Sequence, residues 1–303
     1  MSIDPWGGRG GGSGKSRSDR PQPEVPRGEK TGPYGRSARS DTQVPPVPTE
    51  PVEAPAGGWH AANRTMRELR LHGLNAVKAV FDRRPEAIHK LYLTNARIPT
   101  LQPLLKWCAA NRVGYRVVED DDLKKLAASG HHEGIVADVL RAEPTPLADW
   151  LENLPAGPQC AIWLDGVGNP HNFGAILRSA AHFGVGAILL PAQSTLALSG
   201  AAARVAEGGA EAVTLVRLPD NGDAAARLRA SGFSLAATLV QGGSDVFATP
   251  LPARLVYVLG AEGEGMDRTL ADTCDLRLSI PGSGSVESLN VAAATAVLLA
   301  AWR

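Results

Sequence analysis

The second half of the chain places an arginine inside an apolar helix, in the segment LDGVGNPHNFGAILRSAAHFGVGAILL (residues 164–190). Arg178 lies among large aliphatic residues, so it is either a solvated arginine or part of a polar pocket. A guanidinium in such a pocket binds phosphate or carboxylate groups through several N–H donors. Asn172 near the start of this helix has a plain structural explanation as an N-cap, and Gly174 as a site of close packing.

A second segment, LVYVLGAEGEGM (residues 255–266), runs from an apolar strand into glycines and an acidic residue. The strand runs into Gly260, Glu262, Gly263 and Gly265, and glycines after a strand let backbone amides approach a ligand closely. The pattern is neither the dinucleotide fingerprint nor the lysine-bearing phosphate loop. A tight turn with Glu262 on the surface explains it equally well.

A third segment, LSIPGSGSVESLNVAAATAVLLAAW (residues 278–302), joins a short strand to a C-terminal helix through a Gly/Ser loop. Ser288 is a candidate cap for that helix. Ser288 and Asn290 also lie beside its positive end, where an anionic group of a ligand is stabilised.

These segments belong to a region from about residue 159 that alternates strands with helices. Its strands are apolar on both faces, which is typical of a parallel sheet covered by helices on both sides. Ligands of such sheets bind at the carboxyl ends of the strands, where the three segments lie. The predicted strands are CAIWLDG, AILLP, VTLVRL, SLAATLV, RLVYVLG and LRLSI.

Residues 59–143 predict a smaller α/β domain, and residues 144–158 a proline-containing linker. The spacing of apolar residues predicts a helix over 64–83. It is followed by a strand (KLYLT), a helix over 101–112, a strand (GYRVVE), a helix (DDLKKLAAS) and a last strand (GIVADV). Residues 1–58 contain much Gly, Pro, Ser and Arg and few large apolar residues, and we expect this tail to be disordered.

The net charge of zero conceals an asymmetry along the chain. Residues 1–58 have 8 basic and 7 acidic side chains, residues 59–143 have 14 and 10, and residues 144–303 have 9 and 14. A phosphate-bearing partner would be attracted to the front half, although a small excess of charge also serves solubility alone. The Arg-rich start of the tail could contact RNA non-specifically or act only as a solubilising tail.

The composition excludes several classes of protein. The three cysteines, Cys108, Cys160 and Cys274, are widely separated and lie in or beside apolar runs, which indicates buried thiols rather than disulfides. No Cys/His spacing suggests a zinc site, and we expect no metal. The N-terminus lacks the apolar core of a secretion signal, and no apolar stretch approaches the roughly 20 residues of a membrane helix. We therefore expect a cytoplasmic protein.

The three segments, in this order, resemble the SpoU/TrmH family of RNA 2′-O-ribose methyltransferases, part of the SPOUT superfamily. The resemblance covers residues 160–303 and runs through Asn172–Gly174–Arg178, Gly260–Glu262–Gly263, Ile280–Pro281 and Ser288–Leu289–Asn290–Val291. Residues 70–140 are more loosely similar to the substrate-binding domain of the family, related to ribosomal protein L30e, through HGLNAV and HHEGIVADV.

The resemblance implies a deep trefoil knot formed by the C-terminal segment, S-adenosylmethionine as methyl donor, an RNA substrate and a homodimer. The apolar content of the helices AAATAVLLAA and AILRSAAHF is consistent with a partner subunit. The implied contacts to the methyl donor are Gly260, Ile280 and Leu289, with Thr238 as a less certain neighbour. Which RNA is modified, ribosomal or transfer, stays open.

The implied catalytic residues are Arg178, Asn172, Glu262, Ser288 and Asn290. A guanidinium stays protonated at ordinary pH, so our hypothesis gives Arg178 the binding of an RNA phosphate and of developing alkoxide charge. The other four would orient the ribose, Arg178 and the loops.

Two alternatives belong to other classes. A non-catalytic RNA-binding or ribosome-assembly protein could keep the same fold, but every position that carries the activity of the family has the matching residue type. A dehydrogenase on a dinucleotide-binding sheet is disfavoured, because no G-x-G-x-x-G follows the first strand of the second region.

Overall fold

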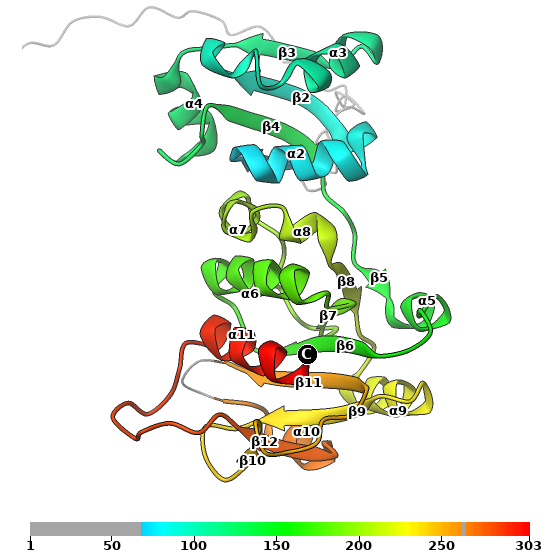
Figure 1. Cartoon of the computed structure of the whole chain (residues 1–303). Coiled ribbons are helices and arrows are strands. Elements are labelled where there is room, and N and C mark those ends of the chain that lie inside the picture. The colour runs from blue at the N-terminus through cyan, green and yellow to red at the C-terminus, as the bar shows by residue number, and fades with distance from the viewer. Residues whose placement is uncertain (1–67, 262–264) are drawn as a thin grey trace, which may run out of the picture. The chain divides into compact units, whose positions relative to one another are not determined.

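The computed structural model describes residues 68–261 and 265–303 (Figure 1). The predicted disordered tail, Glu262 and Gly263 lie outside the described residues. The described chain contains two β-sheets, one of four strands and one of eight, and belongs to one compact unit.

The small domain (residues 68–140) is built on a mixed sheet with the strand order β1-β4-β2-β3. β4 pairs antiparallel with β1 and β2, and β3 is a parallel edge strand beside β2. Its strands are β1 (Glu68–His72), β2 (Ile88–Leu93), β3 (Gly114–Val117) and β4 (Ile135–Leu140), and its helices are α2 (Leu74–Arg83), α3 (Gln102–Ala110) and α4 (Asp120–Ala127), with 3-10 turns η1 (Pro85–Ala87) and η2 (Asn95–Arg97).

The predicted helix over 64–83 is wrong in its first half, because residues 68–72 form β1. Leu69 and Leu71 are buried and Arg70 between them is exposed, which is the two-residue period of a strand. Gly73 then turns the chain at φ +97°, a conformation that favours glycine, and α2 starts at Leu74.

The large sheet confirms the predicted parallel α/β architecture, and its eight strands are all parallel. The strand order is β10-β12-β9-β11-β6-β7-β8-β5. The six predicted strands are β6 (Gln159–Asp165), β7 (Ala187–Leu190), β8 (Thr214–Arg217), β9 (Ser234–Thr238), β11 (Arg254–Gly260) and β12 (Leu276–Ser279). Two unpredicted strands of two residues each, β5 (Thr145–Pro146) and β10 (Ser244–Asp245), form the edges.

Helices cover both faces of this sheet, which is why its strands are apolar throughout. On β6, Ile162 belongs to a core with α6 and α11, and Trp163 belongs to a second core with α9 and α10. The alternation follows from the two-residue period of a strand. The helices are α5 (Leu147–Glu152), α6 (Pro170–Phe183), α7 (Gly200–Ala206), α8 (Gly209–Ala212), α9 (Asn221–Ala230), α10 (Arg268–Thr273) and α11 (Val291–Trp302). The segment predicted as a linker thus contains β5 and α5.

The short helices α7 and α8 pack against α6 on one side and against β1 and α2 of the small domain on the other. A Cβ atom at Gly174 of α6 would lie 2.5 Å from the carbonyl oxygen of Ala202. A Cβ atom at Gly209 would lie 2.7 Å from the carbonyl oxygen of Leu177. Gly174 therefore allows α6 and α7 to pack closely, which confirms the sequence interpretation of this glycine.

Cys108 and Cys160 are buried, Cys274 is half-buried, and all three are free thiols. Burial raises the pKa of the Cys160 thiol to about 12.

Over residues 68–261 and 265–303, no helix combines the length and the apolar character that crossing a membrane requires. The same residues contain no group of three or more His, Cys, Asp or Glu side chains that could hold a metal ion.

Candidate functional site

Three of the predicted ligand-binding residues lie at the carboxyl ends of neighbouring strands. Thr238 ends β9 and Gly260 ends β11, and these two strands pair directly. Ile280 follows β12, which pairs with β9 on its other side. The Thr238 hydroxyl donates a hydrogen bond of 2.8 Å to the carbonyl oxygen of Val258, so its side chain is fixed against β11. These three residues therefore line one edge of the sheet.

Gly260 is required by the turn that follows β11. A Cβ atom at this position would lie 2.4 Å from the carbonyl carbon of Gly265 and 2.4 Å from the amide nitrogen of Met266. Ala261 and Gly265 exchange two backbone hydrogen bonds of 2.9 and 3.0 Å, which close the turn. This pairing agrees with a tight turn after β11, while Glu262 lies outside the described residues and the role of Gly260 toward a ligand stays a prediction.

Asn290 and Asn172 join the N-termini of the two helices that cover the same face. The Asn290 side-chain Oδ1 accepts from the amides of Ala292 and Ala293, at 2.9 and 3.4 Å. Its Nδ2 donates to the Oδ1 atom of Asn172 at 3.0 Å. Ser288 is exposed and is not the cap of α11, which corrects that reading of the sequence. One asparagine thus caps α11 and connects it to α6.

The cap of α6 is Asn169 and not Asn172. Asn169 Oδ1 accepts from the amides of His171 and Asn172, at 2.8 and 3.4 Å. Sequence reasoning missed this residue, although the Asn169–Pro170 pair was a usable signal, because proline is favoured at the first position of a helix. The side chain of Asn172 is consequently not used as a cap and is directed to Asn290.

Arg178 is exposed on α6, two turns beyond Asn172, so the polar-pocket reading does not hold within a single chain. Its charge nevertheless influences the carboxylate of Glu207, the residue that follows α7. The pKa of Glu207 is held below its usual range by a hydrogen bond from Asn75 first, and then by the charges of Arg204 and Arg178. Arg178 and Glu207 are therefore close enough for the positive charge of Arg178 to favour the ionised form of Glu207.

The loop between β12 and α11 exposes apolar side chains next to the strand ends. Leu289 is 48% exposed and Val286 is 70% exposed, while Ile280 is half-buried at the start of the loop. A ligand with an apolar ring would find aliphatic contacts at Ile280 and Leu289 and backbone groups at Gly260. These residues fit an adenosine-bearing ligand by their chemistry.

The fold and these strand ends define a class of protein, and comparison with known proteins identifies it. The model of the SpoU rRNA Methylase family matches residues 159–300. A model described as RNA 2′-O ribose methyltransferase substrate binding matches residues 70–145.

The chain belongs to the SpoU rRNA methylase family. It is 39% identical over 236 residues to a protein of Escherichia coli O157:H7 named "uncharacterized tRNA/rRNA methyltransferase YfiF", covering 78% of this chain and 68% of that protein. It is 34% identical over 232 residues to the 23S rRNA (guanosine-2′-O-)-methyltransferase RlmB of Vibrio vulnificus, covering 76% and 94%. The family resemblance drawn from the sequence is confirmed.

Two solved structures share the fold. An AdoMet-bound rRNA methyltransferase from Sinorhizobium meliloti superposes with a TM-score of 0.67 at 22% identity, covering 80% of this chain and 90% of that one. The SpoU methyltransferase AviRb from Streptomyces viridochromogenes, in complex with AdoMet, gives a TM-score of 0.66 at 21% identity, covering 79% and 91%.

Proposed function

We propose that this protein transfers a methyl group from S-adenosylmethionine to a ribose 2′-hydroxyl in ribosomal or transfer RNA. The observation that carries the proposal is the strand edge of Thr238, Gly260 and Ile280 in a chain of this family. The relatives named above act on RNA according to their names. The setting we propose is the cytoplasm, where these RNAs are found.

We assign the methyl donor to the edge formed by the three strand ends and the following loop. Ile280 and Leu289 would contact its adenosine, Gly260 would offer backbone groups, and Thr238 would support β11 beside them. When bound, this cofactor supplies a methyl group on a positively charged sulfur. We also propose the trefoil knot of the C-terminal segment and the L30e-like character of the small domain.

The chain's own residues then have to align the ribose, exclude water and stabilise charge on the attacking oxygen. Arg178 would hold an RNA phosphate and stabilise the negative charge that develops on the 2′-oxygen as the bond from the methyl group to sulfur breaks, the bond to oxygen forms, and the hydroxyl proton passes to solvent. It is a poor base because a guanidinium remains protonated. Asn172, Asn290, Ser288 and Glu262 would orient the ribose and the loops, with Asn172 and Asn290 acting as one hydrogen-bonded pair.

We propose a homodimer as the active form. Arg178 is exposed on α6 in the single chain, whereas transition-state stabilisation is most effective where water is excluded. A partner subunit or the RNA would have to cover this surface.

The test compares Arg178→Ala and Arg178→Lys with the matched control Arg227→Ala, an exposed arginine of α9 paired with Asp223. Transfer of labelled methyl groups to unmodified ribosomal and transfer RNA is measured across pH. We expect both Arg178 variants to lose about a hundredfold or more in rate, while Arg227→Ala keeps the wild-type rate. A wild-type rate from either Arg178 variant removes this residue from the mechanism.

Methyl transfer to neither RNA, by a folded wild-type chain that binds both RNA and S-adenosylmethionine, contradicts the proposed activity. RNA binding without S-adenosylmethionine binding would instead favour the non-catalytic RNA-binding protein.

A further inference from the structure

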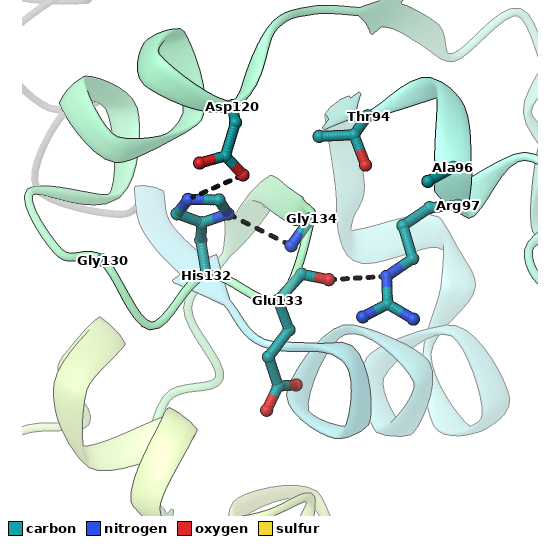
Figure 2. Close-up of a pocket in the computed structure, with 8 residues that line it drawn as sticks. All are labelled: Thr94, Ala96, Arg97, Asp120, Gly130, His132, Glu133 and Gly134. Carbon is teal, nitrogen blue, oxygen red and sulfur yellow. Dashed lines mark hydrogen bonds and ion pairs between the residues drawn. The ribbon is translucent and has the colours of Figure 1, made fainter.

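A pocket of about 360 Å³ opens in the small domain (Figure 2). None of its lining residues belongs to the strand ends of the large sheet. Its walls come from η2 and the residue before it, from the first residue of α4, and from the loop that leads into β4. The lining residues are Thr94, Ala96, Arg97, Asp120, Gly130, His132, Glu133 and Gly134. Most of these carry hydrogen-bonding groups.

His132 presents a buried donor to this pocket. Its side chain is only 3% exposed, and its Nδ1 accepts a hydrogen bond of 3.1 Å from the amide of Gly134. Because Nδ1 accepts this bond, Nε2 carries an N–H donor. Nε2 has no hydrogen-bond partner among the described residues, since the nearest carboxylate oxygen, Oδ1 of Asp120, lies 3.6 Å away. Buried donors without an acceptor are rare and call for an explanation.

Asp120 supplies an ionised acceptor beside this donor. Lys124 lies 3.0 Å from the other carboxylate oxygen, Oδ2, and its hydrogen bond is the main cause that holds the pKa of Asp120 below its usual range. The Asp120 side chain is 59% exposed, so it can turn toward a ligand. A donor and a carboxylate thus stand side by side, as the residues drawn in Figure 2 show.

Arg97 adds a positive charge to the opposite wall. Its Nε donates a hydrogen bond of 2.7 Å to the carbonyl oxygen of Glu133, which fixes the guanidinium beside the pocket. Gly134 keeps this wall compact, because a Cβ atom there would lie 2.8 Å from the Thr94 hydroxyl and 2.9 Å from Cγ of Arg97.

We propose that this pocket binds a guanine nucleotide of the RNA substrate, distinct from the nucleotide that is methylated. His132 Nε2–H donates to the O6 carbonyl, the Asp120 carboxylate accepts from N1–H and the N2 amino group, and Arg97 binds a phosphate. Guanine is the base that presents a carbonyl acceptor followed by two N–H donors along one edge. Unpaired bases of RNA are recognised on such edges. The proposal rests on the proposed function only for the identity of the polymer as RNA.

The same loop connects the pocket to the large-sheet domain. Glu133 Oε1 accepts from Arg204 of α7 at 2.5 Å, and its Oε2 accepts from the amide of Leu74 at the start of α2 at 2.8 Å. Since α7 packs on α6, a nucleotide held in the pocket fixes the RNA relative to the helix that carries Arg178. The pocket would thereby determine which nucleotide of the RNA lies at Arg178.

The test uses the full chain and single-stranded uridine 12-mers with one central guanosine, inosine or adenosine, and an all-uridine control. Dissociation constants are measured by fluorescence anisotropy for the wild type, Asp120→Asn and the matched control Asp121→Asn. Asp121 is the next residue and also pairs with Lys124, so its variant reproduces the loss of charge without touching the pocket. Thermal unfolding verifies that both variants fold.

We expect the wild type to bind the guanosine oligonucleotide about tenfold or more tightly than the adenosine one. Inosine, which lacks the N2 amino group, should fall between them. Asp120→Asn should lose this preference and bind the all-uridine control normally, and Asp121→Asn should keep it. No guanosine preference in the wild type, or a preference that survives Asp120→Asn, overturns the proposal and leaves His132 and Asp120 as a structural pair.

A second measurement locates the binding site. In protein with ¹⁵N-labelled histidine, the Nε2 resonance of His132, assigned by its absence in His132→Gln, should shift on saturation with GMP and not with AMP. An unmoved resonance at saturation contradicts the assignment. Both readouts measure binding and are independent of catalysis. Methyl transfer without a preference for guanosine contradicts only the proposed guanine site. A preference for guanosine without methyl transfer contradicts only the proposed activity.

Discussion

At the scale of single residues, Asn290 has two separable structural tasks. It caps α11 and donates to Asn172. Asn290→Ala should therefore lower the free energy of unfolding by about 1 kcal/mol through loss of the cap. Ser288→Ala removes an exposed side chain and should stay within about 0.5 kcal/mol of the wild type. Asn172→Ala leaves the cap of α11 intact and should destabilise less than Asn290→Ala. Urea unfolding measures all three variants. A destabilisation of Ser288→Ala that equals that of Asn290→Ala would contradict the assignment of the cap.

The cysteines give a second prediction at this scale. Burial raises the pKa of Cys160 to about 12 and that of the half-buried Cys274 to about 11. The thiolate is the reactive form, so at pH 8 almost no thiolate exists, and reactivity should rise as the pH approaches these values. We expect Ellman's reagent to label Cys274 slowly and Cys160 hardly at all in the native protein, and all three thiols after denaturation. Rapid labelling of Cys160 in the folded chain would show that its segment opens readily.

Residue types and spacing, with the family resemblance, nominated the side chains of the candidate site, but did not predict the structural role of each. Asn172 and Asn290 were both assigned to it, and the structure joins them by a hydrogen bond. Their capping roles were not accessible, because a cap depends on which residue first adopts helical dihedral angles. Both Asn169 and Asn172 were chemically suitable for α6, and both Ser288 and Asn290 for α11. Their roles in catalysis remain predictions.

At the scale of elements, the close contact between α6 and α7 predicts opposite effects for two glycine substitutions. Gly174→Ala places its Cβ 2.5 Å from the carbonyl oxygen of Ala202, so the helices must separate, at a cost of about 1–3 kcal/mol. Gly222→Ala in α9 meets only a side-chain oxygen of Asp220 at 3.4 Å, and should stabilise by about 0.5–1 kcal/mol through helix propensity.

Thermal and urea unfolding of the two variants measure these changes. Both substitutions gain helix propensity, so a difference in sign between them reports the contact at Gly174. Stabilisation by Gly174→Ala would show that α6 and α7 do not pack as described.

The elements of the large sheet were predictable because burial on both faces leaves a continuous apolar run. Those of the small domain were harder. Leu69 and Leu71 fit both a helical stripe that continues into α2 and a strand, and only the turn at Gly73 decides between them. The edge strands β5 and β10 have two residues each, too few for any period to be seen.

At the scale of the whole molecule, the order of the strands could not be predicted from periodicity. β11 lies between β9 and β6, so the sheet is not assembled in the order of the chain. The C-terminal helix returns to the centre, where the buried Tyr257 hydroxyl of β11 donates to the carbonyl oxygen of Leu298 at 3.0 Å. Such long-range closure depends on tertiary contacts that local sequence patterns do not encode.

This arrangement predicts that binding of the methyl donor depends on the last 25 residues. A chain ending at Leu278 lacks Ile280, Leu289 and α11, and therefore loses two of the four proposed contacts to the cofactor together with the helix that packs on α6. Calorimetric titration should show loss of S-adenosylmethionine binding by this truncated chain, and size-exclusion chromatography should show loss of the proposed dimer. A control chain ending at Trp302 removes only Arg303 and should bind normally.

Truncation also removes core side chains such as Leu298 and Leu299, so the shortened chain could fail to fold. Leu289→Asp in the full chain separates the two effects, because Leu289 is 48% exposed and contributes little to the core. We expect this variant to keep the wild-type melting temperature and to bind S-adenosylmethionine at least tenfold more weakly, since a carboxylate replaces an apolar contact to the adenosine. Wild-type affinity in Leu289→Asp, or retained binding by a folded chain that ends at Leu278, would place the donor elsewhere. Either result would also contradict the roles proposed for Gly260, Ile280 and Thr238.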